Sequence, residues 1–458
     1  MKKPLLSFYG DDFTGATDAM DALSRQGVRT VLFLETPDPE QIEEEFNAMD
    51  AIGVAGMSRS LRAEQLDEEL SPAFETLKEI GAPITHYKIC STFDSSPHVG
   101  SIGRAIEIGQ RVFKSSFVPV SVGVPQLQRF VAFSNLFAQD NGSIYRIDNH
   151  PTMSDHPVTP MQHGDLRTHL RKQTDCNISR MDVTQLQGDQ SSVDEAFQSV
   201  RDSKTEILLF DTVTESDMKS VGRLMWESSQ QESGSLFIVG SSGVEYALAN
   251  HWQQINTHDT NTVYQPPDAV DRLLVMSGSA SPMTRSQIEW AVDNGFTGIR
   301  INTKALIDPV SAEQERREVR QKALGALDTG NSVVLYTALG PDDTSISEAK
   351  RHYEQIASKS ESLGDSLGRH QGQIVKGILD EVNLERICIA GGDTCGHVMS
   401  ALDIYTLESK APIAPGAPLC RIQSYSPEFK DVGVALKGGQ LGQIDYFGRV
   451  RDGKESTN

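Results

Sequence analysis

The sequence predicts an α/β protein with two domains, each built around a mostly parallel sheet. Short apolar runs alternate with amphipathic segments from the N-terminus onward, and such alternation is typical of repeated βαβ units. It stops in a polar stretch near residue 260 and then begins again. At 458 residues, the chain is long enough for two or three domains of about 150 residues each.

The first domain is expected over residues 1–255. Residues 5–9 and 28–34 are mostly apolar and have the character of strands. Residues 16–26 between them have helical spacing and end at Gly27, which predicts one βαβ unit. Further strands are expected at 51–54, 84–88, 117–120, 207–210 and 236–239, with helices at 63–79 and 193–203.

A linker is expected at residues 256–270, which are polar and contain Pro266-Pro267. The second domain should then span 271–448, and 449–458 should form a flexible tail. Its strands are expected at 272–276, 332–336, 387–390 and 433–436, and its helices at 281–294, at 312–327 and after Gly396. Residues 359–372 are rich in Ser, Gly and charge, and predict either a mobile loop or a plain surface excursion.

Composition argues against several classes of partner. The 63 acidic and 42 basic side chains give a net charge of −21, which repels nucleic-acid backbones and anionic membrane surfaces. The chain has no apolar run of membrane-spanning length and no signal peptide, so a cytoplasmic protein is expected. Its five cysteines are scattered and odd in number, which disfavours disulfides and zinc sites. The sequence leaves open whether the chain forms a homo-oligomer.

A glycine-rich turn follows the apolar run 387–389 and precedes a segment with helical spacing. Glycines let backbone amides approach an anion, and a helix N-terminus adds about half a positive charge. The turn therefore indicates a seat for the phosphates of a nucleotide, although a glycine pair after a strand is also common in plain turns. Its residues are Gly391, Gly392, Asp393, Thr394, Cys395 and Gly396.

Two further turns in the same domain have a similar setting. Small hydroxyl residues and a glycine follow the strand at 272–276, and a cation with two glycines follows the strand at 433–436. Three such turns in one domain favour a nucleotide site more strongly than any one of them does. The residues concerned are Ser277, Gly278, Ser279, Lys437, Gly438 and Gly439.

An acidic pair, Asp11 and Asp12, follows the first predicted strand and is itself followed by Thr14. The carboxyl ends of parallel strands are where open α/β sheets bind ligands. A carboxylate there could accept hydrogen bonds from a polyol or act as a general base toward a hydroxyl. The alternative is a helix N-cap without a ligand.

Two cations, Arg59 and Lys88, also follow apolar strands, where each could pair with a protein carboxylate or hold an anionic substrate. Ser91, Thr92 and Asp94 come after Lys88 and are candidate substrate ligands. Cys90 would be a nucleophile only beside a base, and an inert thiol is favoured.

His150 and His156 lie in a loop dense in His, Thr and Pro. Because each proline fixes a backbone dihedral, such a loop could fold rigidly over a small polar ligand. A metal pair is disfavoured, since no third ligand lies at a recognisable spacing and hydrogen-bonded loop histidines are commoner.

In their order along the chain, these motifs resemble those of the four-carbon acid sugar kinases, which are two-domain, ATP-dependent enzymes. The resemblance covers nearly the whole length and includes Ala414-Pro415-Gly416. It implies that residues 1–255 bind a sugar acid, that 271–448 bind ATP with Mg²⁺, and that the ligand cleft lies between the domains. The metal ligands are not assigned.

One motif departs from the family pattern. The family typically has Lys-x-Asp-Ser-Thr-Leu-Arg-Gly-Asn, whereas this chain has Cys90 for the first Asp and Asp94 for the Arg. Replacing a cation by an anion should change which acid is accepted. This form, with the His-Pro-x-x-Pro-Met loop, resembles the 3-oxo-isoapionate kinase branch, and threonate, erythronate and 3-oxo-tetronate are the alternatives.

The expected reaction is direct in-line transfer of the γ-phosphoryl group to a substrate hydroxyl. Asp11 or Asp12 would orient or deprotonate that hydroxyl, while Arg59 and Lys88 would hold the substrate carboxylate. A non-catalytic sugar-acid sensor regulated by a nucleotide is the competing hypothesis. A dinucleotide-dependent oxidoreductase is disfavoured, because no Gly-x-Gly-x-x-Gly opens either domain.

Overall fold

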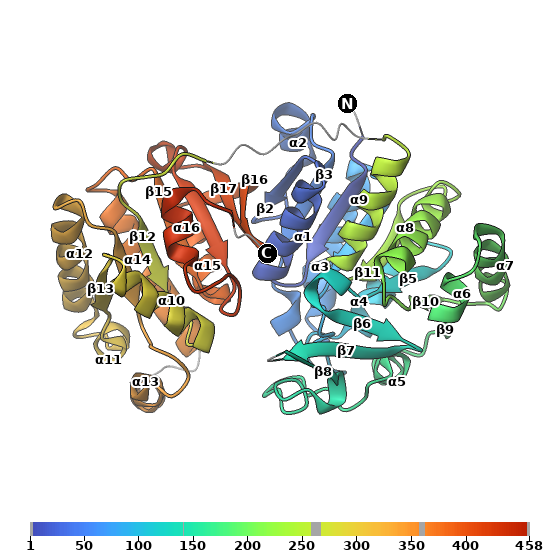
Figure 1. Ribbon diagram of the computed structural model, residues 1–458, viewed down its shortest axis with the longest axis horizontal. Coiled ribbons are helices and arrows are strands. Elements are labelled where there is room, and N and C mark those ends of the chain that lie inside the picture. Colours follow the sequence, from blue (N-terminus) through green and yellow to red (C-terminus); the bar gives the residue numbers. More distant parts are fainter. Residues whose placement is uncertain (1–2, 141, 258–266, 357–361, 456–458) are drawn as a thin grey trace. The chain divides into compact units, whose positions relative to one another are not determined.

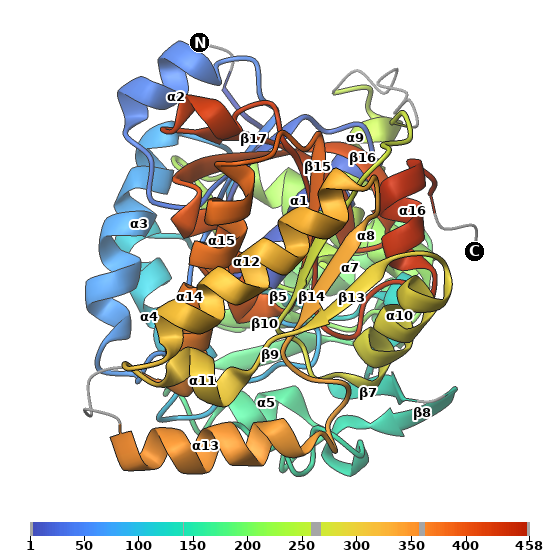
Figure 2. The ribbon, with the colours of Figure 1, turned by 90° about the vertical axis from the view of Figure 1, so that its left-hand side faces the viewer.

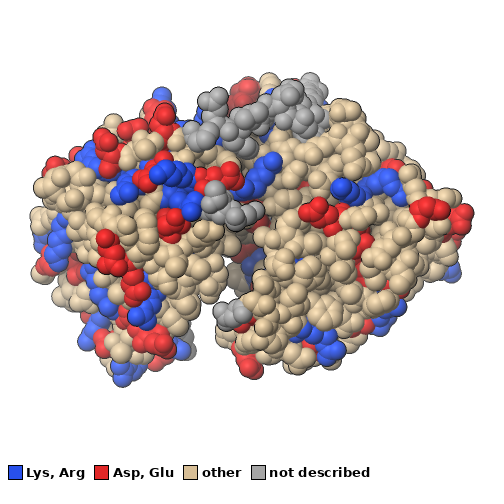
Figure 3. Space-filling view, viewed as in Figure 1, with Lys and Arg blue, Asp and Glu red and all other residues tan. Residues whose placement is uncertain are grey.

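The chain divides into two compact units in the computed structural model, Met1–Thr262 and Val263–Asn458 (Figure 1). The structure describes residues 3–140, 142–257, 267–356 and 362–455. Most of the linker expected at 256–270 therefore lies outside the described residues. Acidic and basic side chains are interspersed on the face of each unit that Figure 3 shows. Among the described residues, no helix has the length and apolarity needed to cross a bilayer.

The first unit contains a wholly parallel sheet with the strand order β2-β3-β1-β4-β11-β5-β10-β9. Because its strands are parallel, their carboxyl ends meet at one edge of the sheet. The strands are β1 (Leu6–Gly10), β2 (Thr30–Phe33), β3 (Ala51–Ala55), β4 (Ile84–Lys88), β5 (Val118–Ser121), β9 (Ile178–Met181), β10 (Ile207–Phe210) and β11 (Leu236–Gly240).

Helices cover both faces of this sheet. On one face α1 (Phe13–Arg25) packs on α9 (Gly243–Gln254), which packs on α8 (Glu215–Ser229) (Figure 1). On the other, α3 (Leu66–Ile80) and α4 (Ile102–Phe113) enclose a core of buried aliphatic and aromatic side chains. The shorter helices are α2 (Pro39–Glu45), α5 (Leu166–Leu170), α6 (Val183–Leu186) and α7 (Gln190–Arg201).

A small antiparallel sheet, which the sequence analysis did not predict, follows β5. It consists of β6 (Arg129–Ala132), β7 (Asn135–Asp140) and β8 (Ser143–Arg146). Isolated bridges join Val124 to Arg129 and Val131 to Thr212. Because Val124 follows β5 and Thr212 follows β10, the small sheet lies at the carboxyl edge of the large one.

The sheet of the second unit has the order β13-β14-β12-β15-β18-β17-β16. Its first five strands are parallel, and the hairpin of β16 and β17 is antiparallel. The strands are β12 (Leu274–Ser277), β13 (Thr297–Arg300), β14 (Val333–Tyr336), β15 (Arg386–Ala390), β16 (Ile404–Ala414), β17 (Ala417–Ser424) and β18 (Gly433–Lys437).

Helices again form two layers in this unit (Figure 2). On one face, α10 (Pro282–Asp293) contacts α16 (Tyr446–Asp452). On the other, contacts link α11 to α12, α13 and α14, and α14 to α12 and α15. The bounds of this second group are α11 (Thr303–Ile307), α12 (Ala312–Asp328), α13 (Thr344–Ile356), α14 (Leu363–Leu379) and α15 (Gly392–Ala401).

Two expectations need correction. The loop expected at 359–372 is, in its described part, the start of α14, where Ser362 and Asp365 form a capping box. The flexible tail expected at 449–458 is wrong for residues 449–452, because α16 runs to Asp452 and Val450 is fully buried.

Candidate functional site

The acidic pair lies at the carboxyl end of β1 and the start of α1. Asp12 is the N-cap of α1, and its carboxylate accepts hydrogen bonds from the Gly15 amide and the Thr14 hydroxyl, each at 2.8 Å. Asp11 is 2% exposed, and burial raises the pKa of its carboxyl group despite the nearby Arg59. Asp12 is therefore a helix N-cap, as one of the two interpretations expected.

Arg59 binds both carboxylates at once. It lies in the 3-10 turn Ser58–Ser60 that follows β3. Its guanidinium donates to Asp11 from Nε at 3.0 Å and Nη2 at 2.6 Å, and to Asp12 from Nη1 and Nη2, each at 2.9 Å. Although burial opposes the charge, the two carboxylates raise the pKa of Arg59 well above its ordinary value. Of the two fates left open for this cation, pairing with protein carboxylates is the one observed.

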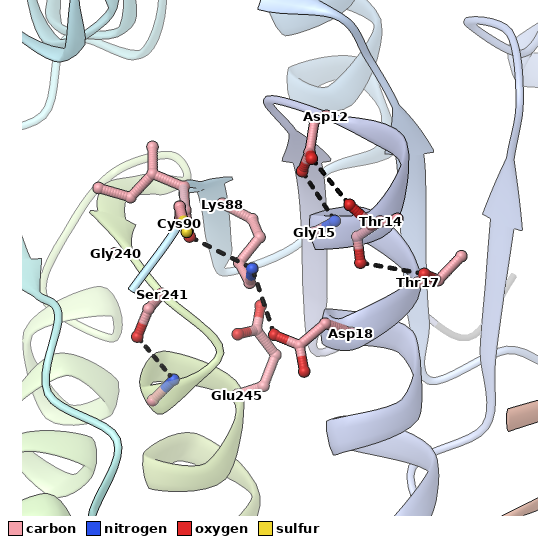
Figure 4. A network of polar contacts seen from close by, with 12 residues as sticks. Asp12, Thr14, Gly15, Thr17, Asp18, Lys88, Cys90, Gly240, Ser241 and Glu245 are labelled. Carbon is pink, nitrogen blue, oxygen red and sulfur yellow. Dashed lines mark hydrogen bonds and ion pairs between the residues drawn. The ribbon is translucent and has the colours of Figure 1, made fainter. Parts of the chain in front are cut away.

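Lys88 is the last residue of β4 and is 2% exposed. Its ammonium group lies 3.4 Å from Asp18 Oδ2 of α1 and donates to the carbonyl oxygen of Ile89 at 3.2 Å, and Glu245 of α9 lies beside it (Figure 4). Burial acts to lower the pKa of Lys88, but the negative charges of Asp18 and Glu245 outweigh it and the pKa is raised. Lys88 thus remains an ammonium ion beneath the first turns of α1.

Gly15 marks the point where these charged groups converge. A Cβ atom on this residue would lie 2.5 Å from Asp12 Oδ1, 3.4 Å from Lys88 Nζ and 3.5 Å from Arg59 Nη2. The missing side chain thus lets the Asp12 carboxylate and the two cations approach the first turn of α1 closely.

The loop after β4 forms a chain of polar contacts. The Cys90 thiol and the Thr92 hydroxyl lie 2.8 Å apart, and Thr92 donates to Asp94 at 2.5 Å. Ser91 is half-buried in the same loop. Burial raises the pKa of Cys90 to about 11, so this thiol is protonated at neutral pH, in keeping with an inert side chain.

Both loop histidines accept hydrogen bonds from residues of the loop in which they lie. His150 Nδ1 accepts hydrogen bonds from the amides of Thr152 and Met153, and His156 Nδ1 accepts from Thr159. Neither imidazole has a hydrogen bond or ion pair with the acidic pair in the part of the chain that the structure describes. The same residues contain no cluster of three or more His, Cys, Asp or Glu side chains suited to a metal.

The three glycine-rich turns of the second unit lie side by side, because they follow the neighbouring parallel strands β12, β15 and β18. The Gly278 amide donates to the Ala390 carbonyl, and the Gly391 amide donates to that of Lys437, each at 3.0 Å. Gly391, at φ +127°, is the N-cap of α15 and provides no side-chain cap. The first amides of α15 are therefore not capped by a side chain, as an anion site requires.

Close packing explains several of the glycines. A Cβ atom on Gly278 would lie 2.0 Å from Thr394 Oγ1, and one on Gly439 would lie 2.6 Å from Ser279 Oγ. At Gly396 a Cβ atom would meet nothing within 4 Å, so packing does not account for that glycine. Asp393 is exposed in the first turn of α15.

Lys437 is 1% exposed at the end of β18, where its ammonium group donates to Thr284 Oγ1 at 3.1 Å and to the Gly439 carbonyl at 3.4 Å. Burial lowers its pKa to about 8. Cys395 is also buried, and its thiol donates to the Ile389 carbonyl at 3.6 Å. The sulfur of Cys395 therefore points into the core, which leaves only its backbone for a ligand.

Two residues that contact the glycine-rich turns were not predicted from the sequence. Gln371 of α14 accepts a hydrogen bond from Thr394 Oγ1 at 3.2 Å, and Thr284 of α10 donates to the carbonyl of Gly439 at 2.8 Å. Gln371 lies in the segment expected to be a loop, and only the spacing of Ser362 and Asp365 signalled a helix there. Nothing in the sequence around Thr284 indicates a role in the site, except that it closely follows the turn at 277–279.

Comparison with known proteins agrees with the division into units. Residues 6–248 match the model of a sugar-binding N-terminal domain, and 274–447 match that of a nucleotide-binding C-terminal domain. A 3-oxo-isoapionate kinase of Paraburkholderia graminis is 40% identical over 98% of this chain and 94% of its own length. A 3-oxo-tetronate kinase of Pseudomonas savastanoi pv. phaseolicola is 27% identical over 98% of this chain and 97% of its own.

Solved structures share the fold. A protein from Salmonella typhimurium LT2 superposes with a TM-score of 0.78, at 22% identity over 97% of this chain and 98% of its own. One from Haemophilus influenzae has a TM-score of 0.72, at the same identity and the same coverages. The prediction of a mostly parallel α/β fold is confirmed. With both domain models matched and a kinase relative aligned over nearly its full length, the chain belongs to the four-carbon acid sugar kinase family.

Proposed function

We propose that this chain is an ATP-dependent kinase that phosphorylates a hydroxyl of a small sugar acid, with 3-oxo-isoapionate as the first candidate. The observation that carries the proposal is the 40% identity to a 3-oxo-isoapionate kinase over 98% of the chain. The two candidate sites give it a chemical basis. The first unit offers paired carboxylates held by an arginine at the carboxyl end of β1, and the second offers amide-lined turns beside a lysine.

Within the first unit, Asp12 is the better candidate for the group that orients or deprotonates the substrate hydroxyl. Its side chain is 28% exposed, whereas that of Asp11 is 3% exposed. Asp11 would then act indirectly, because it binds two nitrogens of Arg59 and thereby fixes the guanidinium that holds Asp12. Thr14, Ser91, Thr92, Asp94, His150 and His156 remain candidate ligands for the other polar groups of the acid.

For Arg59 and Lys88 we propose a task that differs from the one expected. The expectation was that both would hold the carboxylate of the substrate. Each instead binds carboxylates of the protein. Arg59 donates four hydrogen bonds to Asp11 and Asp12, and Lys88 forms an ion pair with Asp18. We therefore assign them to offsetting part of the negative charge of the acidic pair and Asp18.

Within the second unit, the turns at 277–279, 391–396 and 437–439 would hold the phosphates of ATP. The uncapped amides of α15 would donate to phosphate oxygens, and Lys437 would add a charge. Mg²⁺ is usually held by phosphate oxygens and one or two carboxylates, and the exposed Asp393 is of that kind. When bound, the metal would neutralise phosphate charge. Transfer then requires the two ligands to meet.

The decisive experiment is an assay of ADP formation. Purified protein would be incubated with ATP, Mg²⁺ and each of 3-oxo-isoapionate, 3-oxo-tetronate, threonate and erythronate. We expect acid-dependent ADP and a phosphorylated acid, with the highest kcat/KM for 3-oxo-isoapionate. Binding of an acid and ATP without any ADP would instead support a nucleotide-regulated sensor.

The variant Asp12→Asn tests the role of the carboxylate, because asparagine also caps helices well and should preserve α1. A loss of about 10²- to 10⁴-fold in kcat is expected if Asp12 is the general base. Asp165→Asn is the matched control, since Asp165 is also a helix N-cap paired with an arginine, Arg167, 2.8 Å away. Turnover of Asp12→Asn near the wild-type value would refute the assignment.

A further inference from the structure

We propose that Arg129, the first residue of β6, binds the carboxylate of the sugar acid. This inference rests on the proposed function and names the residue that would distinguish an acid from a neutral sugar. No sequence motif marks Arg129, and the strand that positions it was not predicted.

The candidate site needs another cation. Arg59 and Lys88 already bind protein carboxylates, and the surrounding acids Asp11, Asp12 and Asp18 outnumber these two cations. Asp94 adds a further negative charge to the neighbouring loop. An anionic substrate would be repelled unless a group outside this network compensated its charge.

Arg129 lies at the same edge of the sheet as the acidic pair. The chain leaves β5 at Ser121, turns, and pairs Val124 with Arg129 through hydrogen bonds of 2.8 and 3.1 Å. Because β5, β11, β4 and β1 are neighbouring parallel strands, this turn and the loop after Lys88 leave the same edge. Burial lowers the pKa of Arg129, while the neighbouring Cys90 of that loop and Asp140 of β7 act to raise it.

Only some of the N–H donors of the Arg129 guanidinium have hydrogen-bond partners among the described residues. Its Nη1 donates to the carbonyls of Leu127 and Gln128, at 3.0 and 3.2 Å, which fixes one side of the group. Its Nε is buried without a hydrogen-bond partner, and Arg129 forms no ion pair with any residue that the structure describes. By contrast, Arg146 of the same small sheet pairs with Asp148 at 2.7 Å.

An unpartnered donor of this kind favours an anionic ligand. Leaving a buried N–H unsatisfied is unfavourable, and more so for a charged group. The Nε and Nη2 atoms of an arginine form a planar fork that matches the two oxygens of a carboxylate. The remaining side of the Arg129 guanidinium therefore has the charge, the geometry and the unsatisfied donor that a sugar-acid carboxylate would complement.

The test compares Arg129→Gln and Arg129→Lys with the wild type and with Arg146→Gln, a paired arginine of the same sheet. In Arg129→Gln we expect KM for the acid to rise about 10- to 100-fold, while kcat and KM for ATP change little. The wild type should prefer the acid over its primary amide, and Arg129→Gln should lose that preference. Arg129→Lys, which keeps the charge but not the fork, should fall between them.

A binding readout separates this inference from the proposed function. The acid alone should raise the melting temperature of the wild type and of Arg146→Gln, but not that of Arg129→Gln. If the wild type forms ADP and Arg129→Gln keeps the wild-type KM and preference, the inference fails and the function stands. If no ADP forms but the acid stabilises only proteins with Arg129, the function fails and the inference stands. Should Arg129→Gln not fold, an unchanged KM in Arg129→Lys would overturn the inference.

Discussion

At the residue scale, Arg59 decides how much negative charge the first unit presents to a ligand. One guanidinium shared by Asp11 and Asp12 leaves a net charge of one unit on the three groups together. It also fixes all four carboxylate oxygens, two of which accept further bonds from Thr14 and Gly15. A preorganised carboxylate of this kind needs little rearrangement before it meets a hydroxyl.

Gly15→Ala should therefore damage catalysis more than stability. The new Cβ atom, 2.5 Å from Asp12 Oδ1, would displace that carboxylate, and a misplacement of this size can reduce turnover about 10²-fold. Alanine also favours the helix by up to about 1 kcal/mol, which offsets part of the strain. The measurements are kcat for the sugar acid and the melting temperature.

Gly325→Ala is the control for this substitution. Gly325 lies in α12 of the other unit, and a Cβ atom there would meet nothing within 4 Å. It should increase stability slightly and leave turnover unchanged. Wild-type turnover in Gly15→Ala would contradict the placement of the substrate at this point.

Lys437 should give the enzyme a pH-dependent affinity for ATP. Burial lowers the pKa of Lys437 to about 8, so the free protein loses this charge as the pH rises through that value. KM for ATP should therefore increase above about pH 8, with kcat less affected because bound phosphate restores the charge. In Lys437→Arg, which stays charged, the profile should be flatter, and a flat profile in the wild type would be contrary evidence.

The lowered pKa of Lys437 also determines how the stability of the fold changes with pH. Below about pH 8 the lysine is protonated in both states, and burying its charge disfavours folding. Between about 8 and the ordinary value of 10.5, the unfolded chain binds more protons than the folded protein, so this contribution to stability rises with pH. The difference in the free energy of unfolding between wild type and Lys437→Met, measured in urea across that pH range, would give the contribution of Lys437.

At the scale of elements, α14 and α15 position the phosphate turn. Gly368 and Gly372 are one helical turn apart on α14, where Cβ atoms would lie 2.1 Å from His397 Cδ2 and 2.8 Å from the His397 carbonyl. The two helices therefore approach closely only because both residues lack side chains. Since Gly391 is the N-cap of α15, the same contact holds the first amides of α15 in place.

Gly372→Ala should consequently weaken nucleotide binding from a distance. Overpacking of this kind costs about 1–3 kcal/mol, and relief requires α15 to shift. We expect a lower melting temperature and a higher Kd for ATP by calorimetry, with the affinity for the acid unchanged. Gly364→Ala in the same helix, where the nearest atom is 3.7 Å away, should change neither; equal effects in both variants would argue against this contact.

Elements with strong periodicity could be predicted from the sequence, and elements set by tertiary contact could not. The parallel strands appear as apolar runs because both faces are buried, so β1, β4, β10, β11 and β15 were expected close to their observed bounds. The helix α14 was missed because Ser362, Gly364 and Gly368 dilute its apolar face and favour loops. The β6–β8 sheet was missed because its strands are only partly buried and therefore lack continuous apolar runs.

The positions of the candidate site residues could be predicted from the sequence, but their contact partners could not. Turns at strand ends revealed Asp11, Asp12 and the glycine clusters, because ligand sites of parallel sheets lie there. The partner of a cation is a long-range property, so whether Arg59 and Lys88 bind protein or substrate could not be decided from one sequence. Arg129 depends on a strand that was itself not predicted.

On the scale of the whole molecule, each unit contains a sheet, a core and half of the proposed chemistry. Pro267 and Asp268 belong to the second unit, because Arg386 donates to the Asp268 carbonyl at 2.8 Å and a Cβ atom on Gly453 would collide with Pro267. The net charge of −21 makes both anionic ligands depend on local cations.

Separate fragments should keep binding but lose catalysis. Residues 1–257 should bind the sugar acid and residues 267–458 should bind ATP, each measured by calorimetry on a fragment that unfolds cooperatively. Neither should form ADP, and the mixture should be much slower than the intact chain, because the second ligand is no longer delivered within one molecule. ATP bound by the folded N-terminal fragment instead would reverse the assignment of the units.

The glycine turns of the second unit also bear on how this protein could be given a new acceptor. Their donors are mainly backbone amides, which most point substitutions leave in place, whereas the acid would be recognised by side chains from residues 90–94 and by Arg129. A directed-evolution library confined to Ser91, Thr92, Asp94 and Arg129 should therefore shift acceptor preference while the phosphate donor is retained.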